Sequence, residues 1–301
     1  MASITVALVS RDSEARLAIA RAFDAAPQQW DVSLHLDPPA GADVIVWGSD
    51  LQAEAPDGAI VFDGEPESTV ARVKTRTARD VSRLYVLTGA GRGVGVTAVA
   101  AHLARAASLR FDTCAVDLDG WRGLSDWFSL DPGNSLTWKD IDDSPESARR
   151  AAHPVEGGFR LLVGPASGDA EVEDVLDRVL GEFDRVVVDC PWGDGVGRAC
   201  RNGRAGVMIV PYSAAGAGRA AALLESEADF PWAIALNRLG PGGETTKLSL
   251  QREMGRRAAV EFPCTPALRD AADEGRLLMA PWSRFTRRVE SLFKALEGVG
   301  P

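Results

Sequence analysis

The stretch that decides the fold is Thr88–Ala104, TGAGRGVGVTAVAAHLA, which directly follows the apolar run LYVL at residues 84–87. Four glycines occur between residues 89 and 97, and a helix is expected to begin near Thr97. A glycine-rich turn between a strand and a helix presents a concave set of backbone N–H groups, and the helix dipole strengthens their attraction for anions. The stretch therefore predicts a phosphate-binding loop. The position directly before Thr97, where such a loop carries its lysine, is occupied by Val96.

The residues after the loop alternate between apolar strands and helical segments. The expected strands are nearly continuous apolar runs, which is typical of parallel strands covered by helices on both faces. They lie at residues 113–119, 159–165, 185–191, 206–211, 232–237 and 258–263, with a loop-rich insert from residue 120 to about Pro154. We therefore predict an α/β fold with a mostly parallel, doubly wound sheet, in which ligands bind at the carboxyl ends of the strands.

A smaller α/β unit precedes this sheet. Its expected strands lie at residues 4–10, 30–36, 43–49 and 59–63, and a helix is expected from Ser13 to Ala25. A polar stretch, residues 63–83, follows these strands and has no strand-like alternation, so a helix is an alternative within it. We place the domain boundary in this stretch. The predicted domains are residues 1–78 and 79–301.

Composition excludes several classes of protein. The 301 residues are 46% hydrophobic and 25% charged, as in ordinary globular proteins. The net charge of −10 argues against DNA binding, because neutralising phosphates requires a basic surface, although residues 197–204 and Arg219 are candidates for a local basic patch. No stretch reaches the ~20 apolar residues of a membrane span. Four cysteines without a CxxC pair indicate a reducing cytoplasm.

Three aspartates fall where strands of the predicted sheet end. Asp117 and Asp119 close the strand that follows the loop and its helix, and Asp189 closes a later strand. Together with the hydroxyl of Thr97, carboxylates beside a phosphate loop can hold a metal ion and orient a water molecule. The alternative is that these aspartates cap helices or form turns.

Four stretches occur in a recognisable order: VLTGAGRGVGVTAVAAHLA, AVDLDG, FDRVVVDCP and ALNRLG. In order and spacing they resemble the MinD/ParA superfamily of deviant P-loop ATPases. The nearer resemblance is to the CpaE/TadZ (septum-site-determining-like) branch, through a receiver-like first domain, the missing lysine, the segment GLSDWFSL…SLTWKDI and the ending FPCTPALRDAADEGRLL. The resemblance covers residues 84–297 well, and the N-terminal unit by architecture only. It implies ATP and Mg²⁺ as cofactors, a homodimer, and a pilus or secretion ATPase or a division-site protein as partner.

Carried over residue by residue, the resemblance implies a nucleotide site. Thr97 and Asp189 would bind Mg²⁺, partly through water, with Asp117 near the metal. Asp119 would be the catalytic residue that positions the attacking water. Asn237 and the segment after Pro263 would face the adenine. The phosphates would be wrapped by Gly91, Arg92, Gly93, Val94, Gly95, Val96, Thr97 and Ala98.

The chain departs from the superfamily at two loop positions. Gly91 stands where the superfamily carries a signature lysine that reaches across a dimer, and Val96 replaces the loop's own lysine. Losing two positive charges weakens triphosphate binding and slows hydrolysis more, because charge stabilisation dominates the catalysis of phosphoryl transfer. Three hypotheses stay open: a nucleotide-responsive scaffold with little or no hydrolysis, a slow ATPase that uses Arg92, and a pseudo-ATPase that binds no nucleotide.

The N-terminal unit resembles a response-regulator receiver that has lost its chemistry. Asp12 follows the first strand, but Trp47 and Gly48 stand at the tip of the third strand, where receivers carry the phosphoacceptor aspartate, and Asp50 lies beyond the tip. We therefore expect an interaction or dimerisation module rather than a phosphorylation switch. The expected location is the cytoplasm, with recruitment through partners to a pole, the septum or the inner face of the membrane as alternatives.

Overall fold

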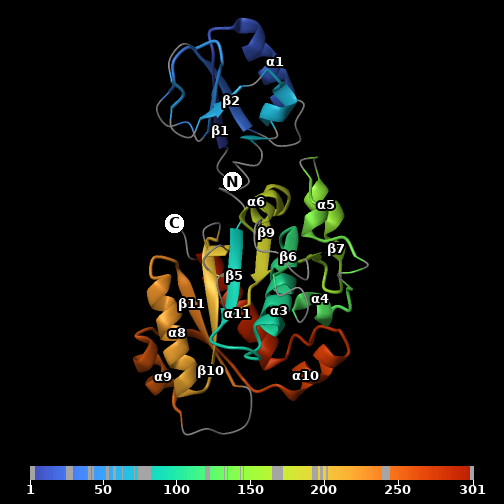
Figure 1. Cartoon of the computed structure of the whole chain (residues 1–301), viewed down its shortest axis with the longest axis vertical. Coiled ribbons are helices and arrows are strands. Elements are labelled where there is room, and N and C mark those ends of the chain that lie inside the picture. Colours follow the sequence, from blue (N-terminus) through green and yellow to red (C-terminus); the bar gives the residue numbers. More distant parts are fainter. Residues whose placement is uncertain are drawn as a thin grey trace. The chain divides into compact units, whose positions relative to one another are not determined.

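The computed structural model divides the chain into two compact units, Met1–Val81 and Ser82–Pro301 (Figure 1). The boundary predicted after residue 78 falls in the stretch 74–82, which lies outside the described residues, so it stays a prediction. The structure describes residues 4–24, 30–39, 42, 44–51, 54–56, 59–62, 64–70, 72–73, 83–118, 123–131, 133, 135–142, 144, 146–164, 172–191, 196, 199–200, 203–238 and 245–298.

Among its described residues, unit 1 forms a four-stranded parallel sheet in the order β2-β1-β3-β4. On one face, β1 packs Val6 and Leu8 against α1, and on the other it packs Val9 against Trp47. The polar stretch 63–83 does contain a helix, over residues 66–70 and 72–73. The elements match the expected segments: β1 (Ile4–Val9), α1 (Ser13–Asp24), β2 (Trp30–His35), β3 (Val44–Trp47) and β4 (Ile60–Val61).

Asp50 is tied to the turn that follows β1. Its carboxylate accepts hydrogen bonds from Ser10 Oγ at 2.7 Å, from the backbone N–H of Arg11 at 2.7 Å and from that of Asp12 at 3.0 Å. Partial burial works to raise the pKa of Asp50, but these hydrogen bonds outweigh it and hold the pKa below its usual value. The carboxylate therefore stabilises the turn as an anion that is already occupied by three donors.

We expect acetyl phosphate to leave the chain unmodified, because the three donors on Asp50 compete with an incoming phosphoryl group. Intact mass spectrometry after incubation with acetyl phosphate and Mg²⁺ measures this. A single phosphoryl adduct that disappears in Asp50→Ala would contradict the expectation.

Unit 2 is built on an eight-stranded sheet, as far as the described residues show, in the order β12-β11-β10-β5-β9-β6-β8-β7. Neighbouring strands run parallel except at one edge, where β7 is antiparallel to β8. The strands are β5 (Arg83–Gly89), β6 (Thr113–Asp117), β7 (His153–Pro154), β8 (Arg160–Val163), β9 (Arg185–Asp189), β10 (Ala205–Pro211), β11 (Trp232–Asn237) and β12 (Ala258–Phe262).

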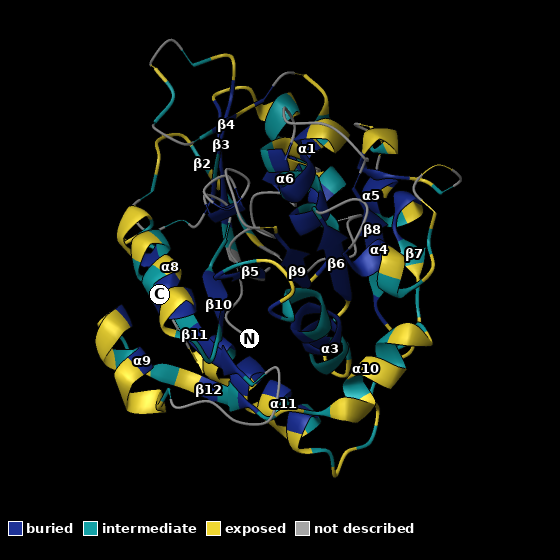
Figure 2. Ribbon diagram, turned by 60° about the horizontal axis from the view of Figure 1, so that its bottom comes forward, coloured by how far each residue is buried: buried dark blue, intermediate teal, exposed yellow. Residues whose placement is uncertain are grey.

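Helices cover both faces of this sheet. Helices α3 (Val96–Ser108) and α11 (Arg284–Gly298) bury their apolar residues against one face. Against the other face pack α5 (Ser147–Ala151), α6 (Val172–Glu182), α8 (Ala214–Ser226) and α9 (Lys247–Met254). The central strands are buried, whereas α10 (Pro266–Asp273) has no buried residue and lies exposed at the rim (Figure 2). The predicted mostly parallel, doubly wound sheet is confirmed.

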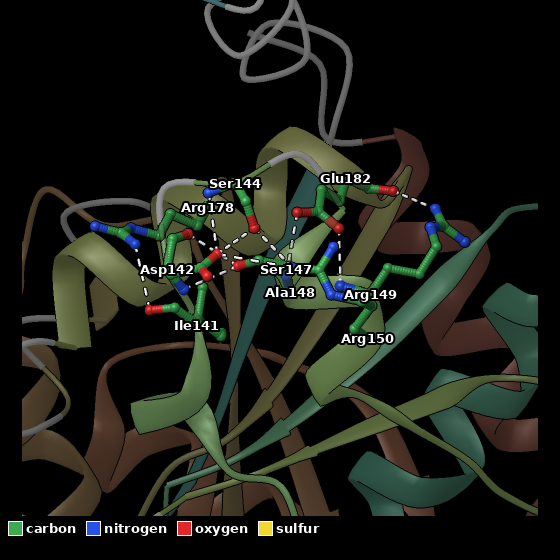
Figure 3. Close-up of polar contacts among 9 residues, drawn as sticks. All are labelled: Ile141, Asp142, Ser144, Ser147, Ala148, Arg149, Arg150, Arg178 and Glu182. Carbon is green, nitrogen blue, oxygen red and sulfur yellow. Dashed lines mark hydrogen bonds and ion pairs between the residues drawn. The ribbon is translucent and has the colours of Figure 1, made fainter.

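The insert after β6 contains more regular structure than the loop-rich segment expected. It holds α4 (Leu124–Trp127), the 3-10 turn η1 (Trp138–Asp140) and α5. Glu182, the last residue of α6, accepts hydrogen bonds from the first-turn N–H groups of Ala148 and Arg149, as Figure 3 shows. These helix N–H groups have no partner within α5, so Glu182 satisfies them and fastens the insert to α6.

The last helix closes the core rather than presenting a free apolar face. Phe285, Val289 and Leu292 of α11 are at most 2% exposed. Trp282, which precedes the first residue of α11, is 79% exposed. Among the described residues, no helix is long and apolar enough to cross a membrane.

His102 lies buried in the middle of α3 and is satisfied as a neutral ring. Its Nδ1–H donates to the carbonyl oxygen of Ala98 at 2.7 Å, and its Nε2 accepts from the N–H of Leu278 at 3.0 Å. Burial lowers the pKa of the imidazole to about 4, although the hydrogen bond to Ala98 works to raise it. Protonation of Nε2 would break the bond to Leu278, so this histidine stabilises the fold only in its neutral form.

We expect His102 to make the chain less stable as the pH falls from about 6.5, the pKa of an unfolded histidine, towards about 4. Between these values the unfolded state binds the extra proton. From pH 7 to pH 5 the wild-type chain should lose about 2 kcal/mol more unfolding free energy than His102→Gln, which cannot titrate. Urea unfolding at both pH values measures the difference, and equal losses in the two chains would contradict it.

Candidate functional site

The loop between β5 and α3 has a backbone that only glycine adopts easily. Gly91, Gly93 and Gly95 have φ angles of 142°, 69° and 93°, in the region where a side chain would clash with the backbone. Gly95 is the N-cap of α3, which has no side-chain cap and no acidic residue in its first turn. Left-handed glycines that alternate with other residues turn the N–H groups of the loop to one side, so loop and helix together form a concave anion-binding surface.

This loop lines a cleft of about 1030 Å³. The residues predicted to wrap the phosphates, Gly91 to Ala98, all lie along it. The cleft is also lined by Trp127, Asp189, Cys190, Pro191 and Arg219. The structure therefore brings the predicted phosphate loop and one predicted metal ligand, Asp189, to the same cleft.

Val96 does not place a charge in this cleft. Gly89 lies beneath the loop, and a Cβ added there would meet Cγ2 of Val94 at 2.4 Å and Cγ2 of Val96 at 2.7 Å. Both valines therefore pack over the end of β5, and Val96 also contacts the core formed by α3 and α11. Arg92 is exposed on the loop and forms no hydrogen bond or ion pair with the described residues.

Asn237 holds the loop from β11, which is separated from β5 by β10. It ends β11, is 9% exposed, and donates a hydrogen bond from Nδ2 to the carbonyl oxygen of Val94 at 2.8 Å. A contact with adenine stays a prediction for this residue. Pro263 lies elsewhere, along a separate cavity of about 550 Å³ with Arg238, Glu261, Arg284, Arg287, Arg288 and Ser291.

The aspartates at the strand ends have different surroundings. Asp117 and Asp189 are register partners on the adjacent strands β6 and β9, and both are buried. Asp117 Oδ2 accepts hydrogen bonds from both the N–H and the Oγ of Ser125, each at 2.7 Å, so its carboxylate fixes the start of α4. Asp119 lies outside the described residues, so its catalytic role stays a prediction.

The residues along the cleft fit a Mg²⁺ ion bound jointly by the protein and a nucleotide better than a metal ion bound by protein side chains alone. No group of three or more His, Cys, Asp or Glu residues in the described part of the chain could hold a metal ion. Thr97 and Asp189 do line the same cleft. Mg²⁺ in proteins is commonly held by one or two oxygen side chains together with phosphate oxygens of a nucleotide. A hydroxyl, a carboxylate and a phosphate-binding loop supply that combination.

Arg219 and Trp127 are among the cleft residues that the sequence did not assign to the nucleotide site. Arg219, on α8, donates from Nε to the carbonyl oxygen of Ala90 at 2.7 Å. Trp127, at the end of α4, donates from Nε1 to the carbonyl oxygen of Arg276 at 3.2 Å. The only signal for Arg219 was its place in the helix after β10, the strand that pairs with β5.

Solved structures of three proteins share this arrangement of sheet, loop and helices. The ParA family ATPase from Chlorobium tepidum TLS matches with a TM-score of 0.62 and 19% identity, over 71% of this chain and 98% of its own. The septum site-determining protein MinD from Pyrococcus horikoshii OT3, complexed with Mg-ADP, matches with a TM-score of 0.62 and 20% identity, over 72% and 96%. The MinC:MinD cell division protein complex from Aquifex aeolicus matches with a TM-score of 0.62 and 18% identity, over 72% of this chain and 96% of the matched chain.

The chain has the MinD/ParA fold. The matched share of the chain corresponds to the size of unit 2. No protein-family model matches the sequence, and no curated protein matches it. Within the MinD/ParA fold, the glycine loop lies at the carboxyl end of β5, as the sequence pattern predicted.

We expect Gly95→Ala to destabilise unit 2 more than Gly93→Ala. Both glycines are left-handed, which costs an alanine about 1 kcal/mol, but nothing lies within 4 Å of a Cβ on Gly93. A Cβ on Gly95 would lie 2.6 Å from Nδ2 of Asn237 and would break its bond to Val94, which adds about 1 kcal/mol. Urea unfolding of both variants measures the difference, and equal costs would contradict the role of Asn237.

Proposed function

We propose that the chain is a nucleotide-responsive scaffold of the CpaE/TadZ type, which binds ATP and Mg²⁺ through a lysine-less phosphate loop with little or no hydrolysis. The observation that carries this proposal is the combination of an intact glycine loop with the apolar side chain of Val96 packed over Gly89. The loop keeps the N–H groups that attract phosphate and lacks the charge that favours the transition state of phosphoryl transfer.

Each remaining residue has a proposed part in binding. The loop N–H groups and the start of α3 bind the phosphate chain, while Asn237 keeps the loop in shape through Val94. Thr97 and Asp189 hold Mg²⁺ together with the nucleotide. A bound Mg²⁺ would neutralise phosphate charge and orient the phosphate chain. Asp119, placed after β6 by sequence, positions water if turnover occurs.

The proposed partner is a pilus or secretion ATPase or a division-site protein, with the chain acting as a homodimer. A relative by fold, MinD of Aquifex aeolicus, is solved in complex with MinC, which supports a partner-binding role for this fold. Unit 1 is the proposed contact module, and its strand order β2-β1-β3-β4 agrees with the start of the flavodoxin-like order that receivers share. Leu34 and Leu36, at and just beyond the end of edge strand β2, are 51% and 59% exposed, and exposed apolar side chains favour contacts with other proteins.

The test places a lysine charge at position 96 of the loop. We expect the wild-type chain to bind ATP-Mg²⁺ with a micromolar or higher dissociation constant, which corresponds to a binding free energy of about −8 kcal/mol or weaker. We expect it to release negligible phosphate. Val96→Lys should tighten binding at least about tenfold, whereas Val96→Met, which is long but uncharged, should not. Isothermal titration calorimetry and a phosphate-release assay measure both properties.

Three results would contradict parts of this proposal. Wild-type turnover that Asp119→Ala abolishes would identify a slow ATPase. Absence of heat at millimolar ATP would identify a pseudo-ATPase that binds no nucleotide. Equal affinities of the Val96→Lys and Val96→Met variants would show that charge at this position is not what the loop lacks.

A further inference from the structure

The positive charge that the loop lacks is present beside it, on another element. Arg219 lies on α8 and lines the cleft. Its Nε donates to the carbonyl oxygen of Ala90 at 2.7 Å, and its Nη2 lies 3.2 Å from the position that a Cβ on Gly91 would occupy. The guanidinium therefore packs against the first left-handed glycine of the loop.

Gly91 leaves the space that this guanidinium fills. Its φ of 142° favours glycine, and any side chain there would press on Arg219. By the resemblance described above, position 91 is also where the superfamily carries its signature lysine. The chain thus combines the loss of a side chain on the loop with a cation that reaches the same place from α8.

The guanidinium has donors to spare. Of its five N–H donors, the bond to Ala90 uses one, and no other hydrogen bond or ion pair joins Arg219 to the described residues. Arginine stays protonated at every physiological pH, and its planar fork suits phosphate oxygens. Arg92 is exposed like Arg219 and also lines the cleft, but no hydrogen bond or ion pair with the described residues holds it against the loop.

We propose that Arg219 binds the phosphate chain of the nucleotide from within the same chain and supplies the charge that Gly91 and Val96 do not. The inference rests on the proposed nucleotide binding and names the residue that provides its charge. Because the arginine belongs to the same chain as the loop, this phosphate contact does not require a second copy of the protein.

The experiment compares charge with hydrogen bonding at this position. Arg219→Gln keeps a donor for Ala90 and loses the charge, Arg219→Lys keeps the charge, and Arg252→Gln, at an exposed arginine of α9 that does not line the cleft, is the control. Calorimetric titration with ATP-Mg²⁺ and with inorganic tripolyphosphate, at low and high salt, should show at least about tenfold weaker binding of both anions by Arg219→Gln, or ~1.4 kcal/mol. Its affinity should depend less on salt, because one charge contact is gone.

Arg219→Lys should recover part of the affinity, and Arg252→Gln should change it less than about threefold, as expected of an exposed charge outside the cleft. If the wild-type chain binds neither anion, the proposed function itself has failed. If the wild-type chain binds and Arg219→Gln loses no more affinity than Arg252→Gln, only the role of Arg219 is overturned. Wild-type affinity in Arg219→Gln with weakened binding in Arg219→Ala would overturn it too, since the arginine would then only hold Ala90.

Discussion

The cleft depends on how the glycine loop is held in place. A loop in which left-handed glycines alternate with other residues has no strand or helix to satisfy its backbone, and unpaired buried backbone groups are costly. Here the N–H of Ala90 donates to Ile209 of β10 at 2.8 Å, and the carbonyl oxygen of Val94 accepts from Asn237 at the end of β11 at 2.8 Å. The next two strands of the sheet, β10 and β11, thus hold the loop at its start and near its end, and the position of α3 follows from this.

A loop of this kind can contribute to the affinity for phosphate without raising the rate of phosphoryl transfer. Backbone N–H groups and a helix N-terminus attract phosphate in the ground state as well as in the transition state, and uniform binding of that kind does not accelerate a reaction. A lysine inside the loop adds charge where it develops during transfer, and Val96 cannot. The apolar packing of Val96 over Gly89 is therefore the basis of our proposal that the nucleotide is a ligand more than a substrate.

Local sequence signals predicted most of the fold and the centre of the site. The strands were recognisable because each is a continuous apolar run, and the loop because its glycines precede a helix. The short helices α4 and α5 were missed because four or five residues are too few for a helical period to show.

Local sequence signals could not predict contacts between residues that are distant in sequence. Arg219 and Ala90 are 129 positions apart, and nothing in either stretch marks the pair. Asp117 was predicted as a residue near the metal from its strand end, but its bonds to Ser125, which the structure adds, depend on how the chain turns after β6. Strand ends predict where polar groups gather, and the packing of inserts decides which neighbour each group meets.

The contact between Gly91 and Arg219 has an evolutionary consequence. A side chain at position 91 and a guanidinium from position 219 compete for one small volume, since a Cβ and Nη2 would stand 3.2 Å apart. Position 219 can change while Gly91 stays, but a side chain at position 91 requires the guanidinium to move. Among descendants of a common ancestor, chains with a large residue at position 91 should therefore have moved or lost the arginine, and chains that keep the guanidinium against the loop should keep the glycine.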